Sequence, residues 1–507
     1  MNTRSLLTED GRRNRLPRHE QLRVCESWWG RHSACRVLLI ALSFPPFAHA
    51  QFGRGGGDWL ASGGDAQRTA SIRTDAHISA EAVQSGVMQL QWKLKLNGVP
   101  SPPVVGSRLI TYKGFKDLMF VSTSTDTVYS IDHPYPRIFW ESHLPYDSLL
   151  VPVKNGTANC PGGMTSALSL AAPLVPPPPP APRGARGPGG VPTAGPGRGG
   201  NMAAAPVVTL PRPRRTPATV YALSSDGLIH VLNQHTGTDI VPAARFIRGN
   251  AKARDVISVG NVVYAVTSDN CGGAPNGVWA IDLADNGVHE YKTEDASVLG
   301  LAFGSDGTVF ATTSKGIAAL EAKTLKVKVQ EDSESATPPL VFKFKDKEYV
   351  VAANVHGHLL VRDPATLAVV VNVPGNGASI GSALASWEEA ESKTRWILAT
   401  KGGAVVAFKV VEKDGSIALE QGWTSREMVS PAPPIVVNGV VFALSSGSRS
   451  APAVLYALDG TTGKELWTSG KTIAGYSTTA LSAGASKIYV GTHDGTLYAF
   501  GFTFPRD

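Results

Sequence analysis

The chain has 507 residues, of which 53 are glycine, 36 are proline and 18% are charged. This composition is typical of many short strands joined by turns, and no long segment has the apolar spacing of an amphipathic helix, so a helical protein is excluded. The net charge of +7 is concentrated in two segments: residues 1–50 hold eight Arg against four acidic residues, and residues 171–217 hold six Arg and no acidic residue. The rest is nearly neutral, which argues against a nucleic-acid-binding protein, because such proteins need positive charge along a folded face.

Residues 1–50 have the features of a cleaved export signal with an unusually long basic region. The apolar run 37–47 follows Arg31 and Arg36 and precedes the small-x-small site Ala48-His49-Ala50, which predicts cleavage after Ala50. The alternative is a buried strand, since the run is too short and too rich in proline to span a bilayer. No second apolar segment of about 18 residues follows, so we expect a soluble chain without a transmembrane segment, in the periplasm or secreted.

After an opening segment (residues 51–87), a strand pattern recurs from residue 88 to residue 502. Residues 88–96 alternate and include Trp92, which predicts a strand. The later copies follow one another at about 35 to 50 residues, the period of a propeller blade, and share the spacing A-x-D-x-x-x-G-x-x-x-W to differing degrees. They begin at Ser130, Val231, Ala280, Ala319, Val361, Ala407, Ala457 and, without a final Trp strand, Ile488.

The clearest copy holds Ala457, Asp459, Gly463 and Trp467. Asp and Gly predict the turn between the third and fourth strands of a blade. The Trp is predicted to pack on the next blade and to donate its indole N–H to a backbone carbonyl there. The same structural role is predicted for Trp92, Asp132 and Trp140.

The last copy, which ends near Phe500, lacks its fourth strand, and residues 88–96 are expected to supply it. Such closure leaves no free sheet edge. Seven internal copies and one shared blade therefore predict an all-β, eight-bladed β-propeller of four-stranded antiparallel blades over residues 88–502, closed by an N-terminal strand that completes the last blade. The pairs Asp226-Gly227, Asp306-Gly307 and Asp494-Gly495 predict hairpin turns within it.

Cys160 and Cys271 are the cysteines that remain after removal of residues 1–50. An oxidising compartment favours a disulfide between them that ties the long insertion to the third blade, and two unrelated buried thiols are the alternative. They follow Asn159 and Asn270, and we hypothesise that their two loops shape one mouth of the axial funnel, where a functional site is best sought. Neither lies in C-x-x-C-H, and two cysteines alone cannot form a zinc site.

Residues 173–217 form an insertion that includes Pro176 to Pro180 and dispersed Arg residues. Because it has almost no residues that could form a core, we expect a disordered loop extruded from the second blade. It is either a spacer without a specific role or a docking arm for an anionic surface.

The repeat spacing resembles that of PQQ-repeat propellers, the quinoprotein alcohol dehydrogenase-like family. The stretch from Asp58-Trp59 through Gly63-Gly64-Asp65 to Gln67-Arg68-Thr69 also resembles the opening segment of quinoprotein dehydrogenases. The resemblance implies eight four-stranded blades and, in the enzymes of the family, pyrroloquinoline quinone (PQQ) with Ca²⁺ on the propeller axis. It includes non-enzymatic scaffolds of outer-membrane assembly, so the fold alone does not choose a function.

The parts of a PQQ enzyme are hard to find in this sequence. Such a site needs a flat slot, cations for the quinone's carboxylates, oxygen ligands for Ca²⁺ and a carboxylate base. The sequence has no adjacent cysteine pair, and Trp59 and Trp387 are better explained by packing than as slot walls. His356 and His358 lack a third ligand, which favours a surface turn. No catalytic, cofactor-binding or metal-binding residue is assigned.

Two functions remain. The first is a monomeric, non-catalytic binding or scaffold module for a protein or glycan partner in the envelope, favoured by the missing cysteine pair and the degenerate blades. The alternative is a PQQ- and Ca²⁺-dependent dehydrogenase with a divergent active site, supported by the Trp motif and the opening segment. Hydrolase and nucleotide-binding motifs are missing.

Overall fold

The computed structural model describes residues 57–111, 113–145, 160, 162–174, 219–293 and 297–502. The chain divides into two compact units, Met1–Gln51 and Phe52–Asp507, and all described residues belong to the second. The export signal predicted at 1–50 and most of the insertion predicted at 173–217 lie outside the described residues. In the part of the chain that is described, no helix is long and apolar enough to cross a membrane.

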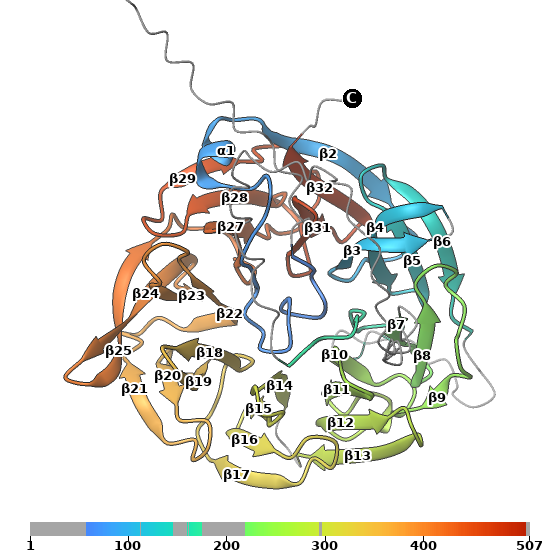
Figure 1. The fold of residues 1–507 in the computed structure, drawn as a ribbon, viewed down its shortest axis with the longest axis horizontal. Helices are drawn as coiled ribbons and strands as arrows, with labels where there is room; N and C mark the ends of the chain where they lie inside the picture. Colours follow the sequence, from blue (N-terminus) through green and yellow to red (C-terminus); the bar gives the residue numbers. More distant parts are fainter. Residues whose placement is uncertain are drawn as a thin grey trace, which may run out of the picture. The chain divides into compact units, whose positions relative to one another are not determined.

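Eight sheets are arranged in a ring around one axis, as Figure 1 shows. Six of them have four strands in antiparallel order. Blade 1 consists of β3 (Val104–Thr111), β4 (Gly114–Thr123), β5 (Thr127–Asp132) and β6 (Arg137–His143). Blade 3 consists of β10 (Lys252–Val259), β11 (Val262–Ser268), β12 (Gly277–Asp282) and β13 (Gly287–Lys292).

The next three blades repeat this order. Blade 4 consists of β14 (Val298–Phe303), β15 (Val309–Thr313), β16 (Ile317–Leu320) and β17 (Val327–Glu331). Blade 5 consists of β18 (Leu340–Phe344), β19 (Lys347–Ala353), β20 (Leu359–Arg362) and β21 (Val369–Val373). Blade 6 consists of β22 (Ile380–Glu388), β23 (Arg395–Lys401), β24 (Ala404–Lys413) and β25 (Ser416–Thr424).

Blade 8 joins the two ends of the propeller. It consists of β30 (Ser482–Gly484), β31 (Lys487–Gly491), β32 (Thr496–Phe502) and, from the start of the propeller, β2 (Met88–Lys95). In the antiparallel pairing of β2 with β32, Trp92 lies opposite Ala499. The predicted eight-bladed propeller and its closure by an N-terminal strand are confirmed.

Two blades depart from the four-stranded pattern. Blade 2 has three strands, β7 (Thr219–Leu223), β8 (Leu228–Asn233) and β9 (Ala244–Arg245), and its inner edge is extended only by a bridge between Ser169 and Tyr221. Blade 7 has β26 (Ile435–Val437), β27 (Val440–Ser445), β28 (Val454–Asp459) and β29 (Glu465–Thr468), and β1 (Ser71–Ile72) pairs parallel with β26 as a fifth strand. Both departures occur where a segment outside the repeat enters the centre of the ring.

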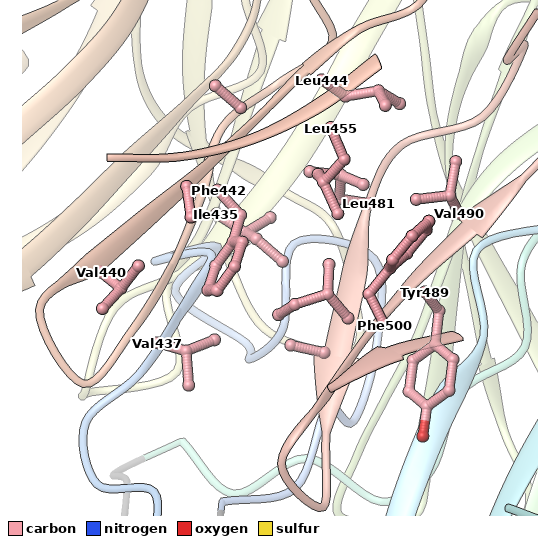
Figure 2. Packing of buried hydrophobic residues seen from close by; sticks show 14 of the residues in the cluster. Ile435, Val437, Val440, Phe442, Leu444, Leu455, Leu481, Tyr489, Val490 and Phe500 are labelled. Carbon is pink, nitrogen blue, oxygen red and sulfur yellow. The ribbon is translucent and has the colours of Figure 1, made fainter. Parts of the chain in front are cut away.

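The core lies between neighbouring blades. Figure 2 shows this packing, in which Phe442 and Leu455 of blade 7 lie on the side toward Val490 and Phe500 of blade 8. Middle strands such as β5 and β27 are buried at every position, because both faces of each sheet pack against another sheet, whereas outer strands such as β13 alternate. This explains why the middle strands have continuous apolar sequences.

The antiparallel order of the strands separates two faces of the ring. Turns between the first and second strands and between the third and fourth strands lie on one face, which we call the docking face. Turns between the second and third strands lie on the other, which we call the disulfide face because it carries Cys271 between β11 and β12. The short helix α1 (Ala80–Gln84) contacts β29, the outer strand of blade 7.

Candidate functional site

The centre of the ring is occupied by the opening segment (Figure 1). Trp59 exchanges two backbone hydrogen bonds with Val105 of blade 1, at 3.1 and 2.8 Å. Further along, the inner strands of blades 4 to 7 donate backbone N–H groups to carbonyls of this segment. The donor and acceptor pairs are Phe303 to Ala66 (2.9 Å), Val341 to Gln67 (3.0 Å), Ser386 to Thr69 (2.9 Å) and Val436 to Ala70 (2.9 Å).

The remaining blades are reached by side chains and by a second segment. Ser486 of blade 8 donates from its hydroxyl to Asp75, at 2.8 Å. Leu170 donates its backbone N–H to Leu60 (2.7 Å), and Ala172 donates to Ser258 of blade 3 (2.8 Å). The chain's own backbone therefore lies beside the inner edges of blades 1 to 7, and a side-chain hydrogen bond reaches blade 8.

The charged residues of the opening segment are engaged within this plug. Arg68 Nη1 lies 2.8 Å from Asp255 Oδ2 of blade 3, and both side chains are less than a tenth exposed. Asp65 accepts hydrogen bonds from the backbone and hydroxyl of Thr69. Burial raises the pKa of the Asp65 carboxyl, and these two bonds oppose that shift. The contacts support the structural interpretation of the segment around Asp65 and Arg68.

The family resemblance implies a PQQ and Ca²⁺ site on this axis, and three observations on the described residues bear on it. Among them, no group of three His, Cys, Asp or Glu side chains could hold a metal. Arg68, which could neutralise a quinone carboxylate, is paired with Asp255. Trp59 and Trp387 are buried and pack against Gly64 and against Gly439 and Gly460, respectively, as expected of packing residues.

Three Trp side chains join consecutive blades in one geometry. Their indole Nε1–H groups donate to the carbonyl that follows the Asp or Asn of the next blade's motif: Trp92 to His133 (2.8 Å), Trp140 to Gln234 (2.8 Å) and Trp423 to Gly460 (2.9 Å). The motif glycine lies under the ring, since a Cβ at Gly463 would be 2.5 Å from Trp423.

The most complete copy in the sequence receives such a Trp but does not donate one in the same way. Asp459 accepts backbone N–H groups from Thr461 and Thr462, and this turn carries Trp423 of blade 6. Trp467 is only half-buried and meets Phe500 edge to face at 5.7 Å between ring centroids. Blade 8 takes its fourth strand from β2, so it has no continuous third-to-fourth turn to receive Trp467.

On the disulfide face, Cys160 and Cys271 form a disulfide with a Cα–Cα distance of 5.4 Å. Cys271 begins a single 3₁₀ turn, and Asn270 before it exchanges hydrogen bonds with Asn276. Asn159 lies outside the described residues. Cys160 precedes the bridge at Ser169, whereas the chain leaves for the insertion only after Leu174. The disulfide therefore ties the approach to blade 2, rather than the insertion, to blade 3.

The docking face carries two cavities that the sequence did not predict. The larger, of about 330 Å³, lies where α1 and the opening segment meet blades 6 and 7, and five of its lining side chains are carboxylates: Glu81, Glu388, Glu389, Glu391 and Asp459. The smaller, of about 160 Å³, has three cations and one carboxylate in its lining, and Arg73 borders both cavities. No sequence signal unites these residues, because they come from separate blades.

A family model described as "Outer membrane protein assembly factor BamB" matches residues 374–502. The match lies in the C-terminal part of the chain, where the repeat spacing is clearest. It supports the family expected from that spacing over these residues. A comparison with curated proteins gave no match.

Solved structures of PQQ-repeat propellers resemble this one at low sequence identity. A quinohemoprotein alcohol dehydrogenase from Comamonas testosteroni is 13% identical with a TM-score of 0.54, over 89% of this chain and 82% of that one. A europium-containing methanol dehydrogenase is 12% identical with a TM-score of 0.54, over 88% and 98%. BamB from Moraxella catarrhalis is 12% identical with a TM-score of 0.50, over 82% and 100%. At these identities the likeness establishes the fold alone.

Proposed function

We propose that this PQQ-repeat propeller is an exported module that binds a protein or glycan partner in the cell envelope without catalysing a reaction. The observation that carries the proposal is the occupied axis. Backbone of the opening segment and of residues 168–172 is hydrogen-bonded to the inner edges of the blades, and the axial Arg68 is held by Asp255. A ring stabilised in this way is suited to present loops from a rigid scaffold.

The disulfide face is the surface that we assign to the partner. Its loops are restrained by the bridge between Cys160 and Cys271, and Asn270 is fixed by its paired bonds with Asn276. Because these loops are ordered before binding, they lose less conformational entropy when a partner binds. This restraint is what supports the assignment of the partner surface to these loops.

The alternative, a PQQ- and Ca²⁺-dependent dehydrogenase, is kept by the fold likeness to a quinohemoprotein alcohol dehydrogenase over 89% of the chain. Calorimetric titration of residues 51–507 with PQQ, with and without Ca²⁺, decides between the two. We expect no heat of binding and no change in Tm. Tight binding that requires Ca²⁺ would overturn the non-catalytic proposal and would justify a screen of alcohols and aldehydes with a reducible dye.

The partner surface has a separate test. A photo-crosslinking amino acid at Asn270 probes the disulfide face, and the same group at Asp285 probes the opposite end of the same blade, in the turn between β12 and β13. We expect adducts in intact cells from position 270 and not from position 285. Equal labelling from both positions, or labelling from 285 alone, would refute the assignment of this face.

A further inference from the structure

The smaller cavity of the docking face lies where the opening segment meets blades 4, 5 and 6. It has a volume of about 160 Å³ and takes its charged lining from three places: Arg73 of the opening segment, Lys343 and Glu348 of blade 5, and Arg395 of blade 6. Three cations thus face one carboxylate. Both oxygens of Glu348 lie 3.2 Å from the backbone N–H of Ser305, so this carboxylate already has a donor.

The two arginines lie near enough to repel each other. Burial lowers the pKa of Arg395, Glu388 opposes that shift, and the charge of Arg73 adds to the lowering. Arg395 forms one ion pair, from Nη2 to Glu388 Oε2 at 2.7 Å. Arg73 also lies near enough to the buried Asp65 for its charge to lower the pKa of that carboxyl, against the larger effect of burial. Like charges around a cavity repel each other unless an anion lies between them.

One buried donor at this cavity lacks a partner. Arg395 is 7% exposed and lines the cavity. Within the described part of the chain, its Nε has no hydrogen-bond partner; the unpartnered Oε1 of Gln67 is an acceptor and does not bind an anion. Buried polar groups in proteins are nearly always bonded, and a guanidinium Nε–H can only donate. Arg395 therefore presents a donor that requires an acceptor.

We propose that this cavity is a binding site for a small free oxyanion, a carboxylate or a phosphate. Arg395 and Arg73 donate to its oxygens, as guanidinium groups do to planar and tetrahedral oxyanions, and Lys343 adds a point charge. The volume is close to that of the cavity of about 150 Å³ that holds benzene in an engineered protein, so a ligand of about six non-hydrogen atoms fits. The site is independent of the partner surface proposed above, which lies on the opposite face.

The test uses inorganic phosphate and malonate as probes, titrated into residues 51–507 at constant ionic strength with NaCl. We expect heat that saturates and a matching rise in Tm, because a ligand that binds only the folded state stabilises it. The Arg73→Gln and Lys343→Gln variants should each weaken binding by roughly tenfold, the effect of losing a bond to a charged group. Glu348→Gln, which removes the opposing charge, should strengthen it.

Arg426→Gln is the matched control, since Arg426 is exposed and pairs with Glu465 at 3.2 Å outside the cavity. It should bind both probes as the parent does. Both Arg73 and Lys343 are exposed, so their variants should fold, and the Tm without ligand verifies this. Saturable binding of either probe that the two variants weaken supports the site. No saturable binding, or binding that neither variant changes, overturns it.

Discussion

The blades are joined by two kinds of contact. Between blades 8 and 1, 1 and 2, and 6 and 7, a Trp lies on the turn of the next blade and donates to its backbone. Between blades 3 and 4, Lys323 pairs with Asp282 and its backbone N–H donates to the hydroxyl of Tyr264 at 3.0 Å. Between blades 4 and 5, Arg362 Nε lies 2.6 Å from Glu331 Oε2.

The comparison shows that a weak sequence repeat does not mean a weak blade. Blades 3 and 4 have Glu290 and Val329 where the motif has Trp, yet their sheets have four strands. Charge pairs replace the indole in these joints. Such pairs need only two residues at the right distance, and their positions differ from joint to joint, so they leave no recurring spacing. Four predictions test the contrast, in order of decreasing effect.

Trp423→Ala removes a buried indole and its bond to Gly460. We expect a loss of about 3–5 kcal/mol in the free energy of unfolding, measured by urea denaturation. Trp467→Ala is the control, because Trp467 is half-buried and does not reach such a turn, and it should lose less than half as much. If the two variants lose the same free energy of unfolding, the contact of Trp423 with the turn of blade 7 adds nothing to stability.

Gly463→Ala tests the turn that receives Trp423. Gly463 has φ +72°, and a Cβ there would lie 2.5 Å from the indole. The strain of an alanine in this left-handed conformation and the clash of its Cβ with the indole should together cost about 2–4 kcal/mol in the free energy of unfolding. Gly415→Ala is a matched control with φ +75° and no atom within 4 Å of the added Cβ, so it should show the strain alone. The two costs, measured by urea denaturation, should therefore differ; if they are the same, close approach of the Trp does not require glycine.

Glu331→Gln and Arg362→Met break the joint between blades 4 and 5 from its two sides. The side chain of Arg362 is 1% exposed and that of Glu331 is 34% exposed. Glu331→Gln leaves a buried guanidinium without its counter-charge and should cost about 2–3 kcal/mol. Arg362→Met leaves a carboxylate that can reach water, so its cost by urea denaturation should be smaller. If Arg362→Met costs more than Glu331→Gln, the stability of this joint does not depend on neutralising the buried charge of Arg362.

Asp282→Asn tests the joint between blades 3 and 4 and should have the smallest effect. The hydrogen bond from Lys323 lowers the pKa of Asp282 below its usual value. The contribution of this carboxylate to stability is therefore present above the unfolded pKa, about 3.9, and is lost as the pH falls through the lower folded pKa. Scanning calorimetry should find a small difference in Tm between parent and variant near neutral pH, which shrinks below about pH 4. A constant difference would exclude the ionised carboxylate as its cause.

The sequence predicted the features that local spacing encodes. The Asp-Gly pairs at 226, 306 and 494 each lie between consecutive strands of one sheet, as expected. Trp92 in an alternating strand indicated the closure of blade 8, which β2 and β32 make. The charged joints were missed because Arg362 and Glu331 are 31 residues apart, and nothing in that separation marks a contact.

By itself, the amino-acid sequence determined the number of blades, their order and their closure. Strand alternation, turn residues and the Trp spacing depend on neighbours within one repeat, so they can be read along the chain. Tertiary structure alone decided the path of the opening segment and the cavity at Arg73, Lys343 and Arg395. Hydrogen bonds along the axis join residues hundreds of positions apart, and the cavity exists only because three unrelated elements meet at the closed ring. Charged residues that are so far apart in the sequence come to line one cavity because the fold brings them together, and their spacing does not indicate it.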